Sequence, residues 1–143
     1  MHPSPSLSTQ LLPAGTLLSL ARRGLVEAAS SPLPPERYAA AHLSALRAAA
    51  AVLACRARPA GSPARRSRPT SAWVLLAVVA PELSEWAAFF AAGARKRAAA
   101  EAGLPSAVTG READDLLRDA QTFLAVVETT LGFDGSQLLL ASG

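Results

Sequence analysis

Apolar residues recur every three or four positions over long parts of the chain, which is the spacing of one face of an α-helix. The first run predicts a helix over residues 16–29, with a buried stripe made of Leu17, Leu18, Ala21, Leu25 and Ala28. A second helix is expected from Pro35 to Ala57, because proline in a first turn costs no hydrogen bond. Its expected stripe is Ala39, His42 or Leu43, Leu46, Ala49 or Ala50, and Leu53.

Two further helices are expected on either side of Pro81. Ser71 can cap a helix over residues 72–80, and the unbroken apolar run from Trp73 to Val79 predicts burial on most of its sides. Pro81 ends that helix and opens a fourth one, which closes with the basic residues 95–97. The apolar positions of the fourth helix are Leu83, Trp86, Ala87, Phe90 and Ala94.

The last predicted helix has the clearest start and the most regular pattern. Thr109 and Glu112 have the capping-box spacing, in which two side chains satisfy free amides at a helix start. Apolar residues then alternate at spacings of four and three, which is typical of a narrow seam packed against other helices. The seam is Ala113, Leu117, Ala120, Leu124, Val127 and Leu131. These patterns predict an up-and-down bundle of about five helices.

Composition supports the same fold class. The chain has 143 residues, which is the size of one domain, and half of it is hydrophobic while only 5% is aromatic. Alanine and leucine, both strong helix formers, dominate, and isoleucine does not occur. We therefore expect an all-α domain over residues 15–132, between a disordered tail at 1–14 and a tail at 133–143. Leu138, Leu139 and Leu140 in that tail could dock on the bundle or on a protein partner.

The modest net charge of +3 conceals two halves of opposite sign. Residues 1–81 hold nine arginines and two acids, or +7, and residues 82–143 hold five basic and nine acidic residues, or −4. No acid lies between Glu36 and Glu82, a stretch that contains Arg37, Arg47, Arg56, Arg58, Arg65, Arg66 and Arg68. Residues 59–69 combine this charge with proline and glycine, which predicts an exposed mobile loop. Such a loop could bind nucleic-acid phosphates or could be a solvated linker.

Several classes of site have no signal in the sequence. Cys55 is the single cysteine, so no internal disulfide can form, and there is no Cys/His spacing of a zinc site and no glycine-rich phosphate loop. The acids Glu112, Asp114 and Asp115 fit a helix first turn, with Arg111–Asp115 and Asp114–Arg118 as helical pairs. The apolar stretch 72–94 is interrupted by Glu82 and Glu85. We expect a cytoplasmic protein with no membrane span, metal or cofactor.

The residues that could carry chemistry are Arg37 and His42, the latter being the only histidine outside the N-terminal tail. They lie five positions apart in one predicted helix, hence about 140° apart around its axis. Convergence on one phosphate would need the helix start to bend, or one residue from each chain of a dimer.

The residues around this pair resemble a known family. The stretch Arg37–Ala48 (RYAAAHLSALRA) resembles the second helix of HEPN domains, and residues 72–77 (AWVLLA) with 81–90 (PELSEWAAFF) resemble a HEPN subfamily of high-GC bacteria. The resemblance implies an up-and-down helical bundle that commonly forms a homodimer. It also implies a superfamily of metal-independent RNases, toxins of toxin–antitoxin pairs, and catalytically silent modules that bind RNA or a nucleotide.

In active HEPN members an arginine, four to six intervening residues and a histidine form the site, paired across a dimer. Arg37 and His42 match that spacing, which implies that Arg37 would stabilise the transition state while His42 moves a proton of the RNA. The family motif lies at the start of the late helix, which here contains Arg111 and Arg118 but no histidine. The expected function is RNA or nucleotide binding, and the sequence leaves open whether the domain also cleaves RNA as a metal-independent RNase or toxin, in which case Arg37 and His42 would form the site. The alternative is a non-catalytic module that docks on a protein through its helical seam or its leucine tail.

Overall fold

The computed structural model describes residues 13–56, 71–104 and 106–133, and these are helical throughout apart from short turns. The helices are α2 (Ala14–Ser30), α3 (Pro34–Arg56), α5 (Ala72–Val79), α6 (Ser84–Ala92), α7 (Ala94–Glu101) and α8 (Gly110–Leu131), with a 3-10 turn η1 (Pro81–Leu83) before α6. The described ranges contain no strand, which confirms the all-α prediction. The tails at 1–12 and 134–143 and the arginine-rich segment 57–70 lie outside the described residues.

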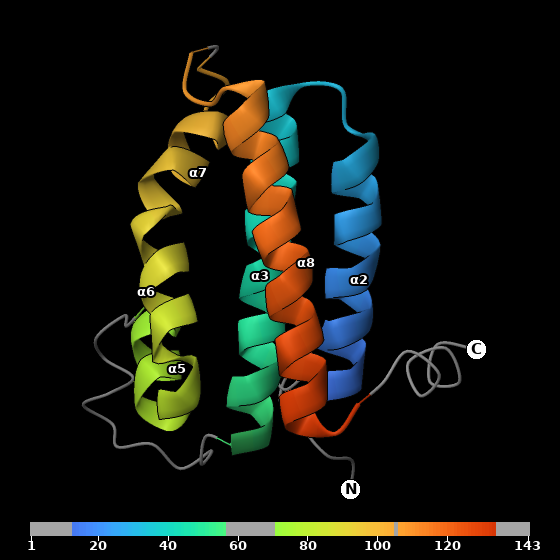
Figure 1. The fold of residues 1–143 in the computed structure, drawn as a ribbon, viewed down its shortest axis with the longest axis vertical. Coiled ribbons are helices and arrows are strands. Elements are labelled where there is room, and N and C mark those ends of the chain that lie inside the picture. Colours follow the sequence, from blue (N-terminus) through green and yellow to red (C-terminus); the bar gives the residue numbers. More distant parts are fainter. Residues whose placement is uncertain (1–12, 57–70, 105, 134–143) are drawn as a thin grey trace, which may run out of the picture.

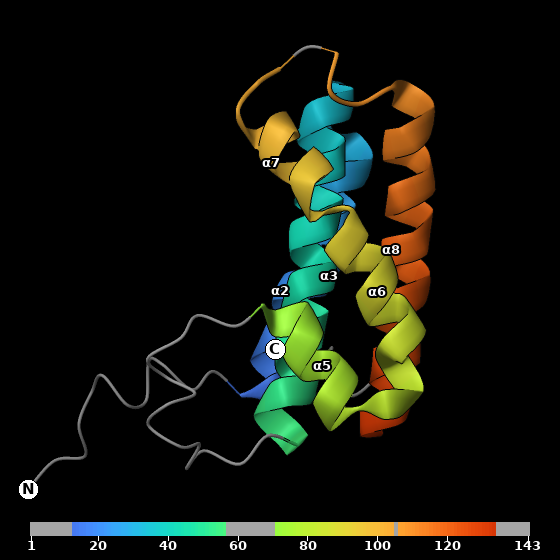
Figure 2. The same cartoon turned by 90° about the vertical axis from the view of Figure 1, so that its left-hand side faces the viewer.

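Helix α3 is the centre of the bundle (Figure 1). Helix α2 forms an antiparallel hairpin with it, α8 packs against both, and α5 and α7 contact α3 on its other side. This is the up-and-down arrangement that the sequence predicts. Figure 2 shows that α6 and α7 form one bent arm that leads back to the start of α8.

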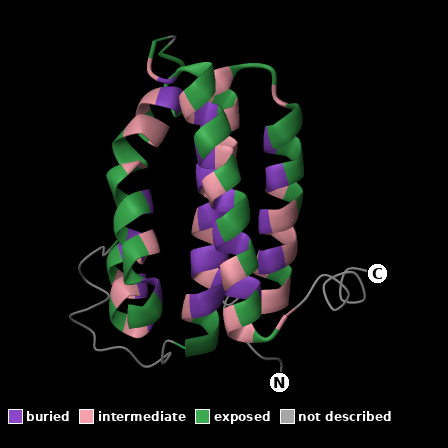
Figure 3. Ribbon diagram, in the orientation of Figure 1, coloured by how far each residue is buried: buried purple, intermediate pink, exposed green. Residues whose placement is uncertain are grey.

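The face of α3 that packs on its neighbours is made of small side chains. Its buried residues include Ala41, Ala45, Ala48, Ala49 and Ala51. In Figure 3 the buried positions, in purple, gather along the inner faces of the helices. The leucines expected in the core, Leu43, Leu46 and Leu53, are only half-buried. A leucine contact face would hold the helices farther apart, whereas alanines let α2 and α8 approach α3 closely.

Helix α6 is held away from α3 and α8 by aromatic rings. Phe90 of α6 lies 5.1 Å, centroid to centroid, from both Trp73 of α5 and Phe123 of α8. Trp86 lies 5.5 Å from Phe123. Such clustered rings each bury a large apolar area, so a few of them can fill this wider half of the core.

The fourth predicted helix is two helices in the structure, because the chain changes direction at Gly93 between α6 and α7. Gly93 faces α3, where the Tyr38 hydroxyl donates a 3.5 Å hydrogen bond to the Gly93 carbonyl. A Cβ placed on Gly93 would lie only 2.8 Å from the Tyr38 hydroxyl oxygen. The absence of a side chain at this position therefore allows the arm to pack on α3.

Both ends of α8 have the expected type of cap. The Thr109–Glu112 capping box forms at its start. At its end Gly132 adopts a left-handed conformation (φ 78°), and the Phe133 amide donates to the Glu128 carbonyl, as in a Schellman motif. This turn directs Phe133 toward the beginning of α2, where its ring lies 3.5 Å from the Cβ position of Gly15.

Among the described helices, α3 is long and apolar enough to cross a membrane when judged by length and composition alone. Half of its most apolar 18-residue window is buried inside the bundle. A core helix surrounded by other helices has the same composition, so packing within the domain accounts for this apolarity. The apolar stretch 72–94 is divided among several shorter elements.

The contact at Gly93 leads to a prediction on stability. Gly93→Ala should lower the free energy of unfolding by about 1 kcal/mol or more, because overpacking against Tyr38 outweighs the gain in helix propensity. Removing the hydroxyl with Tyr38→Phe should make the same substitution neutral or stabilising. Urea unfolding of the four proteins of this double-mutant cycle measures the coupling.

Gly110→Ala is the matched control, because a Cβ at Gly110 meets no atom within 4 Å. This variant should not be destabilised. If Gly93→Ala costs the same free energy with and without the Tyr38→Phe substitution, the proposed role of the hydroxyl is contradicted.

Candidate functional site

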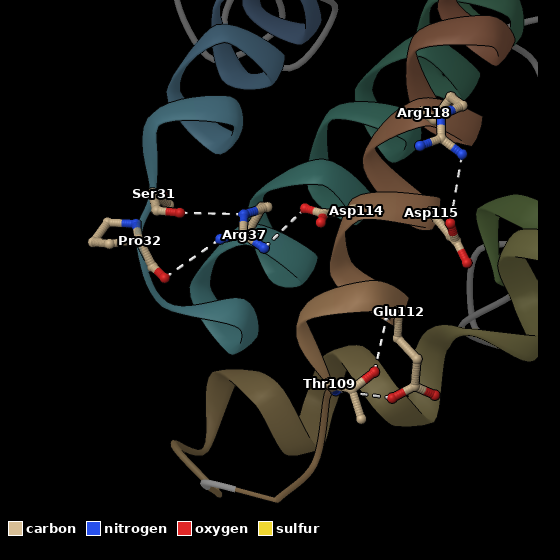
Figure 4. A network of polar contacts seen from close by, with 8 residues as sticks. All are labelled: Ser31, Pro32, Arg37, Thr109, Glu112, Asp114, Asp115 and Arg118. Atoms are coloured by element: carbon tan, nitrogen blue, oxygen red, sulfur yellow. Dashed lines mark hydrogen bonds and ion pairs between the residues drawn. The ribbon is translucent and has the colours of Figure 1, made fainter.

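Arg37, the first residue of the expected catalytic pair, ties two turns of the bundle together (Figure 4). It lies in the first turn of α3, and its Nε donates to the Ser31 carbonyl at 3.2 Å while Nη2 donates to the Pro32 carbonyl at 3.3 Å. Its Nη1 donates to Asp114 Oδ1 of α8 at 3.0 Å. The side chain is only 16% exposed. Arg37 therefore joins the α2–α3 turn to the first turns of α8.

The ion pairs at the start of α8 differ from those expected. Asp114 contacts Arg37 instead of Arg118, and Arg118 lies 3.5 Å from Asp115 (Figure 4). Exposed pairs within one helix are weak, and the guanidinium of Arg37 is already held in place by two carbonyls. A fixed donor of this kind can compete successfully for a neighbouring carboxylate.

His42, the second residue of the pair, is buried in the core with only 1% of its surface exposed. Its Nε2 lies 2.8 Å from the Phe90 carbonyl oxygen, which can only accept, so Nε2 carries the proton. Nδ1 is buried and has no hydrogen-bond partner among the described residues. The ring stacks beside Tyr38 and meets Trp73 and Phe90 edge-on. His42 thus joins α3 to the end of α6.

Burial lowers the pKa of His42 below its usual value of 6.5, and the nearby positive charge of Arg97 lowers it further. The hydrogen bond with the Phe90 carbonyl and the charge of Glu101 act in the opposite direction. The imidazole is accordingly neutral at pH 7, and a second proton would have to enter at the buried Nδ1.

The structure does not bring Arg37 and His42 together. Arg37 contacts the α2–α3 turn and α8, whereas His42 contacts α6, so they share no hydrogen-bond partner among the described residues. A proton-transferring group must reach the atom that it protonates or deprotonates. Joint catalysis by the pair would require both side chains to leave these contacts, and it stays a prediction.

The arginines expected to bind nucleic acid differ in their surroundings. Arg56 Nη1 lies 2.6 Å from Glu82 Oε2, so it joins the end of α3 to η1. Arg47 is half-buried on α3, and no carboxylate of the described residues lies within 4.0 Å of it. The remaining four, Arg58, Arg65, Arg66 and Arg68, lie outside the described residues.

One polar contact in the core was not anticipated from the sequence. Glu128 of α8 is 8% exposed and accepts a hydrogen bond from Arg22 of α2. The sequence places Arg22 off the apolar stripe, and the signal for its partner is that Glu128 directly follows the seam position Val127. Among the described residues, no group of three His, Cys, Asp or Glu side chains could hold a metal ion.

The contacts of Arg37 predict a structural effect of its removal. Arg37→Ala should lower the free energy of unfolding by about 1–2 kcal/mol, because two turn carbonyls and Asp114 lose a charged donor. Asp114→Ala removes only the exposed ion pair and should cost less than about 1 kcal/mol. Urea unfolding compares the stability of the two variants. If Arg37→Ala is no less stable than Asp114→Ala, the proposed role of Arg37 in joining the α2–α3 turn to α8 is contradicted.

Burial of neutral His42 predicts a pH dependence of stability. Below pH 6.5 the unfolded chain takes up a proton that the folded protein resists, so the stability present above that pH declines as pH falls. The slope approaches about 1.4 kcal/mol per pH unit for one proton. In His42→Gln, whose amide can still donate to Phe90, this slope should disappear between pH 7.5 and 5.

His2→Gln is the matched control for the loss of a histidine and should keep the wild-type slope. The carboxyls of Glu82 and Glu112, whose pKa values are lowered mainly by hydrogen bonds, titrate at lower pH. Burial raises the pKa of Asp119, but wild type and His42→Gln share that carboxyl, so the difference between their slopes reports His42. Identical slopes in wild type and His42→Gln would show that His42 protonates freely in the fold.

Comparison with known proteins bears directly on this architecture. A family model described as HEPN_SAV_6107-like HEPN matches residues 28–128, which run from the end of α2 into the last turns of α8. No match was found among curated proteins or among solved structures. The match confirms the resemblance to HEPN domains, while the narrower likeness to a subfamily of high-GC bacteria stays a prediction. The chain belongs to the SAV_6107-like HEPN family.

Proposed function

We propose that this domain binds single-stranded RNA through arginines of the acid-free stretch between Glu36 and Glu82. HEPN membership places the chain, at the coarse level, among nucleotide-related or RNase-like modules. The observation that carries the proposal is the stretch between Glu36 and Glu82, which holds seven arginines and no acid. A segment of this composition attracts phosphates without reading sequence.

The ion pairs narrow the set of arginines that would contact RNA. Arg37 and Arg56 are already neutralised by Asp114 and Glu82. The proposal therefore assigns phosphate binding to Arg47 and to the four arginines from Arg58 to Arg68. Positive charges distributed along a chain match a polymer of phosphates better than the single phosphate group of a mononucleotide.

The proposal is one of binding, because the candidate catalytic residues hold the bundle together. Arg37 is engaged by three acceptors, and His42 is buried and neutral. The docking alternative loses one of its two surfaces, since seam residues such as Ala120, Leu124 and Val127 are buried within the bundle. We place the function in the cytoplasm, where the single exposed thiol of Cys55 would stay reduced.

Salt titration tests the proposal. The affinity of wild type for a fluorescent single-stranded RNA should fall steeply as the salt concentration rises. The triple variant Arg65→Ala/Arg66→Ala/Arg68→Ala should have a slope of log K against log salt concentration that is shallower by about 2, because each lost phosphate contact removes about 0.7 from it. Fluorescence anisotropy from 50 to 300 mM salt measures it.

The matched control removes three arginines elsewhere, Arg23→Ala/Arg95→Ala/Arg111→Ala. These are exposed, and no described carboxylate lies within 4.0 Å of them. Equal losses in both triple variants would mean that net charge alone drives binding. No binding by wild type at low salt would remove the proposal.

A cleavage assay tests the catalytic hypothesis separately. RNA incubated with the protein in the presence of EDTA should remain intact, and cleavage by wild type but not by His42→Ala would restore that hypothesis.

A further inference from the structure

A groove between α6 and α8 exposes aromatic rings beside two carboxylates. It has a volume of about 320 Å³ and is lined by Glu85, Trp86 and Phe89 of α6 and by Asp119 of α8. Phe89 is 44% exposed, an unusual fraction for a large apolar side chain that packs edge-on against the core residue Phe90. In Figure 2 the two helices that form the groove lie on the same side of the bundle.

Neither carboxylate of the groove has a cationic partner among the described residues. No Lys, Arg or His nitrogen lies within 4.0 Å of Glu85 or Asp119, and the adjacent Arg118 pairs with Asp115. Partial burial raises the pKa of Asp119, and the charge of Asp115 adds to this, while Arg118 acts against it. A cation in the groove would favour the ionised form of the Asp119 carboxylate and so offset the effects of burial and of Asp115.

The chemistry of the groove matches a guanidinium group. A planar guanidinium stacks on an aromatic face and donates in a fork to carboxylates, whereas an ammonium is a point charge that stacks less well. The groove places one exposed ring and two unpaired carboxylates of the described residues around one space. Arginine is therefore the side chain that uses all of these features together.

The chain itself contains the complementary segment. Residues 57–70 include four arginines and no acid, and the two halves of the sequence carry +7 and −4. We propose that the Phe89 groove of one copy binds an arginine of the 57–70 segment of a second copy.

This association uses arginines that the proposed function assigns to RNA, but it does not depend on RNA binding. Contacts of this kind are electrostatic in part, so the association should weaken with salt. Two reciprocal contacts would close a dimer, and one-way contacts would build longer assemblies.

Charge exchange between the two surfaces tests the proposal by sedimentation velocity at low salt, over a range of protein concentrations. Wild type should associate, and Glu85→Arg/Asp119→Arg should weaken association at least about tenfold by placing like charges together. Arg65→Asp/Arg66→Asp/Arg68→Asp should do the same. An equimolar mixture of the two variants should associate again, because each supplies the surface that the other lacks.

Two control variants separate the groove from net charge. Glu27→Arg/Glu36→Arg changes the charge by the same amount at exposed carboxylates outside the groove and should associate at least as well as wild type. Phe89→Ala changes no charge and should weaken association. The proposal is overturned if wild type stays monomeric at every concentration, if the groove variant associates like wild type, or if the mixture does not associate.

The RNA assay keeps the two proposals distinguishable. Glu85→Arg/Asp119→Arg should retain RNA binding, since neither residue lies in the arginine-rich stretch. RNA binding without association would remove this inference alone, and association without RNA binding would remove the proposed function alone.

Discussion

The close approach of α2 and α8 to the alanine face of α3 is the constraint on which the rest of the bundle depends. Ala41, Ala45 and Ala48 are at most 1% exposed, so neighbouring helices cover this face of α3 almost completely. Alanine side chains fill little space, so larger side chains must fill the rest of the core. These are the aromatic rings between α5, α6 and α8. The domain thus has a narrow, alanine-packed half and a wide, aromatic-packed half.

Arg37 and His42, the two residues that match an Arg-x4-His motif, each hold one of these two halves of the bundle in place. Arg37 fixes the turn at which the narrow half begins, and His42 holds the end of α6 in the wide half through the Phe90 carbonyl. A spacing of five residues places two side chains on different sides of a helix. In this chain the same spacing lets one helix reach two different neighbours.

Helix periodicity and capping were enough to predict the fold class, the order of the main helices and the start of α8. Both are patterns of residues that lie close together along the chain, so they can be seen in a single sequence. The stripe of α2 is a case in point, since Leu18, Ala21 and Leu25 are all buried as expected. The stripe of α3 was only partly right, because which face is buried depends on how closely other helices approach.

For the candidate site, the sequence predicted which residues could carry chemistry but not which groups their side chains would contact. Asp114 is 77 positions from Arg37, and Phe90 is 48 positions from His42, and no local pattern indicates which distant group a side chain will contact. Gly93 illustrates the same limit. Its φ of −82° is one that any residue can adopt, and the reason for a glycine at this position is the nearby hydroxyl of Tyr38, which belongs to another helix.

The left-handed turn at Gly132 has a consequence for how the domain can be connected. By directing Phe133 against the beginning of α2, it places the entry and the exit of the bundle next to each other (Figure 1). Adjacent ends of this kind allow a domain to be carried as an insertion, or to be circularly permuted, without stretching its core. The two points at which further sequence is joined to the bundle therefore lie at the same corner of it.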